Sequence, residues 1–88
     1  MEQKDFIIVN KMGLHARPAA MFVKKANSFQ SEIWVEKDEE QANGKSIMAL
    51  MMLAAAHGAR IRLTVEGKDE FEAMTILGEL VEAGFYET

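Results

Sequence analysis

The alternation of residues 60–66 places the strongest constraint on how this chain can fold. Apolar side chains stand at every second position, Ile61, Leu63 and Val65, and polar residues stand between and around them. This is the pattern of a strand with one face buried and the other in solvent. Segment 32–36 repeats it, with Ile33 and Val35 on one face. We therefore predict a sheet with one open face, whose other face needs a cover of helices.

Two more strands and three helices are predicted around this pair. The further strands are 6–9 and a short polar strand at 41–44, which follows an acidic turn at 37–40 and would form a hairpin with segment 32–36. The helices are 16–27, 46–57 and one that begins at Asp69 and ends before Gly84. The element order is βαββαβα. It fits an α+β open-faced β-sandwich, with a four-stranded antiparallel sheet and three helices on one face.

The predicted helix ends rest on capping residues. Pro18 suits a first helical turn, Ser46 is a strong N-cap candidate, and Asp69 with Glu72 has the spacing of a capping box. Gly58 is predicted to follow the second helix as its C′ residue, with His57 placing a partial positive charge near its last carbonyls. In the last helix one apolar face is predicted, made of Phe71, Met74, Leu77 and Val81.

Length and composition predict a single domain, residues 1–88, with one core. The chain has 88 residues, a net charge of −4 and no cysteine, so disulfides and thiolate metal sites are excluded. The longest apolar run, 47–56, is too short to span a bilayer, and the charged N-terminus has no signal-peptide hydrophobic region. We expect a cytoplasmic protein without a membrane segment, a metal or a cofactor. The negative charge argues against direct nucleic-acid binding.

Segment 13–20, Gly-Leu-His-Ala-Arg-Pro-Ala-Ala, places a histidine and an arginine at a predicted helix start. An anion held at His15 would meet free backbone N–H groups and the positive end of the helix dipole. Arg17 adds a bidentate donor for phosphate oxygens. No Asp or Glu occurs from Phe6 to Ser31, so the local field favours a negative ligand. The pattern indicates a phosphate site with a nucleophile; a histidine that merely flanks a helix, beside a solvated arginine, fits it too.

Ser46 and the methionines after it form a second candidate region. A phosphate on Ser46 would sit at a helix N-terminus and add negative charge to the surface, although the pattern alone favours plain capping. Met48, Met51 and Met52 share a helix too apolar to be wholly buried in so small a domain. We expect Met48, and Met51 or Ile47, to be exposed as an adaptable contact surface; loose core filling is the alternative. For Trp34, on the open face, a cross-strand contact and a partner contact both remain open.

Segment 13–20 and the sequence Lys-Ser-Ile-Met at 45–48, in a chain of this element order, strongly resemble the HPr family. HPr is the histidine-containing phosphocarrier of the bacterial phosphoenolpyruvate:sugar phosphotransferase system. The resemblance spans nearly the whole chain. It implies that His15 accepts a phosphoryl group on Nδ1 from enzyme I and passes it to enzyme IIA, with help from Arg17. The chain would then be a transiently phosphorylated carrier and not a free-standing enzyme.

The Lys-Ser-Ile-Met sequence looks like that of Gram-positive members. In those members a dedicated HPr kinase/phosphorylase modifies the serine, and the product is a co-effector of the catabolite control repressor. The resemblance implies regulatory phosphorylation of Ser46. It also implies a docking surface for partners, made of Lys24, Lys45, Ile47, Met48 and Met51.

A related branch, the catabolite-repression HPr-like proteins, keeps the serine but lacks the active histidine. The Phe-x-Ser-Glu-Ile stretch at 29–33 and the Glu-Lys-Asp stretch at 36–38 are similar to that branch. The alternative function is therefore a mainly regulatory co-effector that acts through phosphorylated Ser46. Met12 and Asn27 depart from the usual family pattern, which leaves the transfer rate and the partner preference open.

Overall fold

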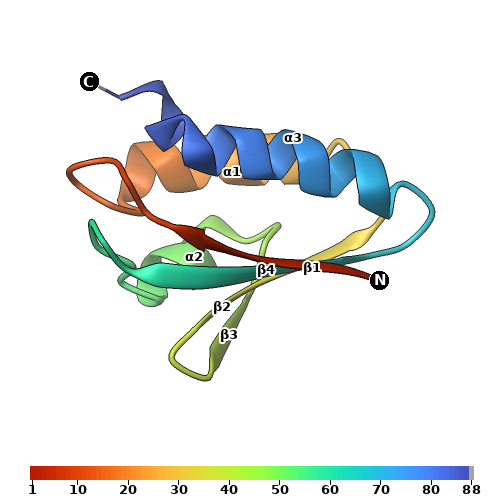
Figure 1. Cartoon of the computed structure of the whole chain (residues 1–88), viewed down its shortest axis with the longest axis horizontal. Helices are drawn as coiled ribbons and strands as arrows, with labels where there is room; N and C mark the ends of the chain where they lie inside the picture. Colours follow the sequence, from red (N-terminus) through yellow and green to blue (C-terminus); the bar gives the residue numbers. More distant parts are fainter. Residues whose placement is uncertain (88) are drawn as a thin grey trace.

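The computed structural model describes residues 1–87 as one sheet with helices packed against it (Figure 1). The strands are β1 (Glu2–Ile7), β2 (Glu32–Lys37), β3 (Glu40–Asn43) and β4 (Arg60–Glu66). The helices are α1 (Ala16–Ala26), α2 (Ile47–Met52) and α3 (Glu70–Glu82), followed by a 3₁₀ turn, η1 (Gly84–Tyr86). Among residues 1–87, no helix has the length and hydrophobicity that crossing a membrane requires.

The sheet has the order β1-β4-β2-β3 with every neighbouring pair antiparallel, which confirms the predicted four-stranded sheet. Val35 stands opposite Leu63, and Phe6 opposite Ile61, so the apolar sides of the strands form one continuous buried face. Helices α1 and α3 lie side by side over that face (Figure 1). The predicted open-faced α+β sandwich is therefore confirmed.

Cross-strand polar pairs and one aromatic residue occupy the open face. Arg62 donates to Asp5 at 2.8 Å, and Gln3 Nε2 donates to Thr64 Oγ1 at 3.0 Å. Trp34 stands opposite Thr64 on β4 and Asn43 on β3, and is half-buried. This is the cross-strand placement that the alternation of β2 predicts.

The first strand lies earlier in the chain than the apolar run 6–9 predicts. Pairing with β4 begins at Glu2, although residues 2–5 are polar, because backbone hydrogen bonds make the ladder and side chains facing solvent can be polar. Ile8 lies beyond the strand but is fully buried. Its N–H still donates to the Ala59 carbonyl at 2.9 Å.

Helix α2 is much shorter than predicted, since it ends at Met52 and not at residue 57. Leu53 N–H bonds back three residues to the Leu50 carbonyl, and Ala54 takes the left-handed conformation with φ 52°. The chain then leaves the helix so that the Ala55 carbonyl accepts the Leu14 N–H at 2.8 Å. His57 therefore does not lie at a helix C-terminus, and the charge role predicted for it is wrong.

Gly58 does adopt a left-handed conformation, with φ 89°, but it does so in the turn before β4 and not as a helix C′ residue. Its N–H donates to the Ile8 carbonyl at 2.8 Å. The hairpin between β2 and β3 is confirmed. Its two turn residues, Asp38 and Glu39, both have positive φ, as a tight two-residue hairpin turn requires.

The start of α3 differs from the predicted capping box. Asp69 is the N-cap, but its carboxylate accepts from Gln30 N–H, Ser31 N–H and the Ser31 hydroxyl, and makes no cap bond. The Ser31 hydroxyl and the Gln30 N–H hold the pKa of the Asp69 carboxyl below its usual value of 3.8. Asp69 therefore ties the start of α3 to the connection between α1 and β2.

Helix α3 buries most of its predicted face, but Phe71 is 74% exposed. At about 100° per residue, Phe71 lies roughly 100° around the helix from the middle of the buried face. That buried face includes Met74, Leu77 and Val81, as predicted. Gly78 lies on the side nearer to Phe71, where the ring of Phe6 packs against the glycine. Helix α3 ends just before Gly84, which has φ 63°, as predicted.

Candidate functional site

His15 lies at the start of α1, as predicted; it is the N-cap residue, and its ring makes no capping hydrogen bond. The residue has extended backbone geometry, and its carbonyl accepts the Ala19 N–H at 3.0 Å. Pro18, in the first turn, brings no N–H to the helix start. The imidazole therefore stands at the positive end of α1 with both ring nitrogens available for other partners.

The loop before His15 is held from beneath by the segment that follows α2. Leu14 is buried, and its N–H donates to the Ala55 carbonyl. Gly13 has φ 68°, and a Cβ at this position would overlap the Ala55 carbonyl oxygen. Because α2 ends early, Ala55 is free to bond to the loop that carries His15, so the end of α2 helps to position His15.

The carboxylate of Glu87, in the C-terminal segment formed by residues 84–87, contacts His15. No pattern in the sequence predicts this contact. Glu87 Oε2 lies 3.0 Å from His15 Nε2. The other oxygen, Oε1, accepts from Asn10 Nδ2 at 2.9 Å, and the same Asn10 amide donates to the Gly13 carbonyl at 2.8 Å. Asn10 and Glu87 are 77 residues apart in the chain, so only the folded structure shows that they meet at His15.

The ionisation of Glu87 decides which nitrogen of His15 is free. The amide of Asn10 and then the His15 ring donate hydrogen bonds that hold the pKa of the Glu87 carboxyl below its usual value of 4.5. An ionised carboxylate only accepts hydrogen bonds, so the hydrogen between the two groups belongs to Nε2. In the neutral ring, Nδ1 then keeps its lone pair.

A shallow hollow of about 770 Å³ surrounds His15. Arg17 lines it together with Lys11 and the residues of the C-terminal segment. Met12 and Met21 contribute its apolar wall, and Glu87 is the one acidic residue among the described residues that line it. The two cations and the helix start favour an anion in this hollow.

Ser46 is the N-cap of α2, as predicted, and its Oγ accepts the Ala49 N–H at 3.2 Å. Four apolar side chains are exposed on the helix that follows: Ile47, Met48, Met51 and Met52. We call these four residues the methionine patch. Met48 is 74% exposed, which confirms the predicted surface position, and Met52 at 77% adds a residue that the prediction left out.

The two lysines predicted to contact partners differ in their surroundings. Lys24 is exposed on α1. Lys45 is half-buried, and its Nζ donates to the Phe29 carbonyl at 2.8 Å. Lys45 therefore ties the start of α2 to the loop after α1. Within residues 1–87, no group of three His, Cys, Asp or Glu side chains is arranged to hold a metal ion.

Comparisons with known proteins agree with this geometry. The family model described as "PTS HPr component phosphorylation site" matches residues 2–83. The phosphocarrier protein HPr of Neisseria meningitidis is 49% identical over 87 residues, which are 99% of this chain and 98% of that protein. The HPr-like protein Crh of Halalkalibacterium halodurans is 51% identical over 82 residues, 93% of this chain and 98% of that protein.

A solved structure of HPr-C-His from Thermoanaerobacter tengcongensis matches with a TM-score of 0.96 at 49% identity. The match covers 100% of this chain and 99% of that one. The fold, the helix start that carries His15 and the family model therefore lead to the same conclusion, that this chain belongs to the HPr family.

Proposed function

We propose that this protein is a phosphoryl carrier of the sugar phosphotransferase system, which accepts phosphate from enzyme I on Nδ1 of His15 and passes it to enzyme IIA. The observation that carries the proposal is the 3.0 Å contact between His15 Nε2 and Glu87 Oε2 at the N-terminus of α1, which leaves Nδ1 with its lone pair when the ring is neutral. The family membership of the chain supports it. The protein is then a transiently phosphorylated component and not a catalyst with turnover of its own.

The chemistry follows from the groups around the ring. The Nδ1 lone pair attacks phosphorus, the bond from phosphorus to the donor breaks, and the donor keeps that electron pair. Free backbone N–H groups at the start of α1 receive the phosphoryl oxygens, and Arg17 supplies a charged donor beside them. Return of the electron pair to Nδ1 releases the group to the next acceptor.

The test is site-mapped phosphorylation with phosphoenolpyruvate and enzyme I, followed by intact mass before and after acid treatment. We expect one acid-labile phosphate on the wild-type protein and none on His15→Ala. His57→Ala is the matched control, because its exposed ring lies outside the hollow and should leave the label intact. A label that persists on His15→Ala would refute the proposal.

Arg17 is assigned to the stabilisation of the transferring phosphoryl group. Arg17→Glu replaces a bidentate donor with a repelling charge, so we expect transfer from enzyme I to slow by at least about tenfold. Lys25→Glu makes the same charge change on α1, outside the hollow, and should slow transfer much less. Equal rates for the two variants in rapid-quench measurements would remove Arg17 from the mechanism.

The methionine patch is proposed as the docking surface for enzyme I and enzyme IIA, with Lys24 and Lys45 beside it. Its exposed thioether and isoleucine side chains suit several partners, because methionine adapts its shape to different surfaces. Lys24 is free to meet acidic residues of a partner. To donate a hydrogen bond to a partner, Lys45 would have to break its bond to the Phe29 carbonyl. Otherwise it attracts an acidic partner only through its charge.

Regulation through Ser46 is the second candidate function, by an HPr kinase/phosphorylase and a catabolite control repressor. The likeness to Crh and the position of Ser46 beside the methionine patch favour it. A phosphate on Ser46 would add about two negative charges at the edge of the docking surface. Acid-stable phosphate on Ser46 after incubation with ATP and the kinase, without any label on His15, would make regulation the main function.

A further inference from the structure

The bridge from Asn10 through Glu87 to His15 has a role beyond holding the C-terminal segment. We propose that Glu87 is a positioning residue, which keeps His15 in the Nε2–H tautomer and stabilises the positive charge that its ring acquires on phosphorylation. Asn10 is the residue that holds Glu87 in place. This inference rests on the proposed function, since it concerns the same phosphoryl transfer.

The geometry of the bridge is that of a built site. Each oxygen of the Glu87 carboxylate has its own donor, Asn10 Nδ2 at 2.9 Å and His15 Nε2 at 3.0 Å. The carboxylate therefore cannot rotate freely. Asn10 is 4% exposed, and its Oδ1 is buried without a partner among the described residues. A buried amide with one unsatisfied oxygen is unfavourable for stability, which points to a role for the hydrogen bonds that its NH₂ group makes.

The backbone of the C-terminal segment is strained in the conformation that brings Glu87 to the ring. Gly84, Phe85 and Tyr86 have φ values of 63°, 56° and 59°, three consecutive left-handed residues of which two are not glycine. Such conformations persist where the surrounding structure imposes them. Here the side chain of Phe85, 1% exposed, is buried in the core and fixes the turn. Strain of this kind concentrates at functional sites.

The charge balance of the reaction shows what the carboxylate does. A neutral imidazole that attacks through Nδ1 becomes an N-phosphorylated imidazolium, because Nε2 keeps its hydrogen while the Nδ1–P bond forms. The new positive charge is shared with Nε2, 3.0 Å from the Glu87 carboxylate. A carboxylate in this position favours the correct tautomer and the charged ring, as the aspartate of a serine-protease triad does. Glu87 is therefore expected to accelerate acceptance of the phosphoryl group.

Two substitutions of Glu87 separate the two effects. Glu87→Gln removes the charge and leaves one oxygen, for which the Asn10 amide and Nε2–H compete, so the Nε2–H tautomer is retained only in part and kcat for acceptance falls about tenfold. Glu87→Ala removes both, so the Nδ1–H tautomer also becomes populated and kcat falls further. Glu82→Gln is the matched control, an exposed glutamate of α3 that does not line the His15 hollow. It should change neither the tautomer populations of His15 nor kcat.

The tautomer is measured by long-range ¹H–¹⁵N correlation of the imidazole in the unphosphorylated full chain, with the ring neutral. This measurement needs no enzyme I, so it stands even if the wild-type protein proves not to be phosphorylated, which would refute the proposed function instead. A wild-type ring protonated on Nδ1 would overturn the inference. So would Glu87→Gln with the wild-type kcat, or with a loss no larger than that of Glu82→Gln.

The role of Asn10 is tested by a double-mutant cycle. Asn10→Ala should populate the Nδ1–H tautomer in the wild-type background and change nothing further in the Glu87→Ala background, because it acts through that carboxylate. Thermal melts show that each variant is folded at the temperature of measurement. If Asn10→Ala does not fold, Asn10→Ser, which keeps a donor of smaller reach, takes its place. A tautomer shift that persists without Glu87 would overturn the role of Asn10.

Discussion

At the scale of single residues, the site depends on side chains and backbone atoms whose partners lie far away in the chain. The helix start sets the position of His15, but the contact of its Nε2 comes from Glu87, 72 residues further along the chain. Gly13 is a similar case, because its positive φ fits a turn, while the lack of room for a Cβ comes from the Ala55 carbonyl. These two contacts determine where the imidazole stands and which nitrogen it presents.

Gly13→Ala tests whether the loop before His15 is held by the segment after α2. We expect a loss of unfolding free energy of about 2 kcal/mol, from the left-handed φ together with the overlap on Ala55, and slower phosphoryl acceptance. Gly58→Ala is the matched control, with φ 89° but no atom within 4 Å of a new Cβ. It should cost about 1 kcal/mol from backbone strain alone. Equal losses in urea unfolding would contradict the proposed close packing at Gly13.

At the scale of elements, α2 is short because the chain must leave it for Ala55 to bond to the β1–α1 loop. Its six residues bury Leu50 and leave the methionine patch exposed. The residue that redirects the chain, Ala54, takes φ 52° without being glycine. The helical pattern of residues 47–57 is real, but tertiary hydrogen bonds at Ala55 prevail over it in the second half.

Ala54→Gly should therefore raise the unfolding free energy, by about 0.5–1 kcal/mol, because glycine takes the left-handed conformation without strain. Ala56→Gly is the control, an exposed alanine of the same segment that has no positive φ. It should lower stability, since glycine there only adds freedom to the unfolded chain. Destabilisation by both substitutions in urea titrations would show that Ala54 is not strained.

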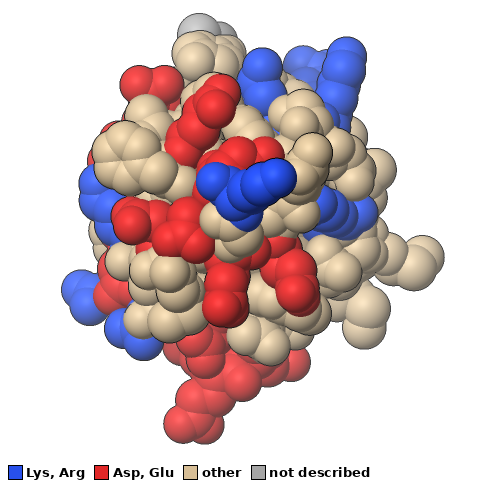
Figure 2. Space-filling view, turned by 90° about the vertical axis from the view of Figure 1, so that its right-hand side faces the viewer, with Lys and Arg blue, Asp and Glu red and all other residues tan. Residues whose placement is uncertain are grey.

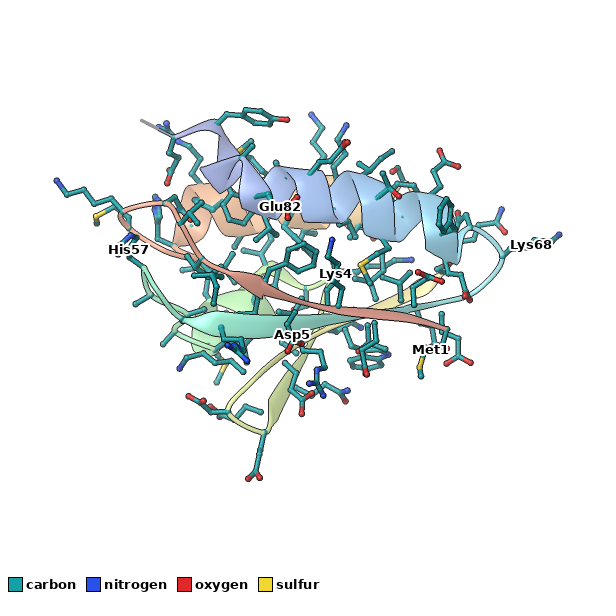
Figure 3. The ribbon with its side chains drawn as sticks, viewed as in Figure 1. Met1, Lys4, Asp5, His57, Lys68 and Glu82 are labelled. Carbon is teal, nitrogen blue, oxygen red and sulfur yellow. The ribbon has the colours of Figure 1, made fainter. Side chains whose placement is uncertain are left out.

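At the scale of the whole molecule, acidic side chains gather at the end opposite the β1–α1 loop that carries His15. Figure 2 faces the end where β1 and α3 begin, and acidic side chains cover much of it. The β1–α1 loop and the C-terminal segment lie at the other end of the molecule (Figure 1). His57 and Lys68 mark the two ends in Figure 3. The hollow at that other end is lined by two cations, Lys11 and Arg17, and by the carboxylate of Glu87, so its surroundings favour an anion.

The hydrogen bonds that the Asp69 carboxylate accepts from Gln30 and Ser31 predict how stability depends on pH. Its carboxyl has a pKa below the usual 3.8 in the folded state, mainly because the Ser31 hydroxyl donates to it. Its contribution to stability is therefore complete above about pH 4–5 and is lost as the pH falls through the folded pKa. Asp69→Asn should lower the free energy of unfolding at pH 7. It should also reduce the loss of stability that the wild-type protein shows between about pH 5 and pH 2.

Urea midpoints at pH 7, 4 and 3 measure this dependence. Glu72→Gln is the control, because Glu72 is exposed and makes no hydrogen bond or ion pair within residues 1–87. It should keep the wild-type dependence on pH. An unchanged acid slope in Asp69→Asn would show that the tie between α3 and the start of β2 does not contribute to acid sensitivity.

Local patterns in the sequence were sufficient for much of the fold and part of the site. The alternation in β2 and β4 specifies a half-buried sheet, and the order of strands and helices leaves few ways to cover it. The helix start at His15 and the cap at Ser46 are readable because both depend on residues within one turn. These features are local in the chain, so sequence alone determines them.

Only the tertiary structure decided the features that depend on distant partners. The end of α2, the role of Asp69, the exposure of Phe71 and the Asn10–Glu87 bridge all arise where segments far apart in the chain meet. Backbone and side-chain hydrogen bonds must be satisfied in the assembled molecule, and there they prevail over local propensity. For this protein, the sequence determines that a histidine stands at a helix start, and the fold determines which of its nitrogens meets the Glu87 carboxylate.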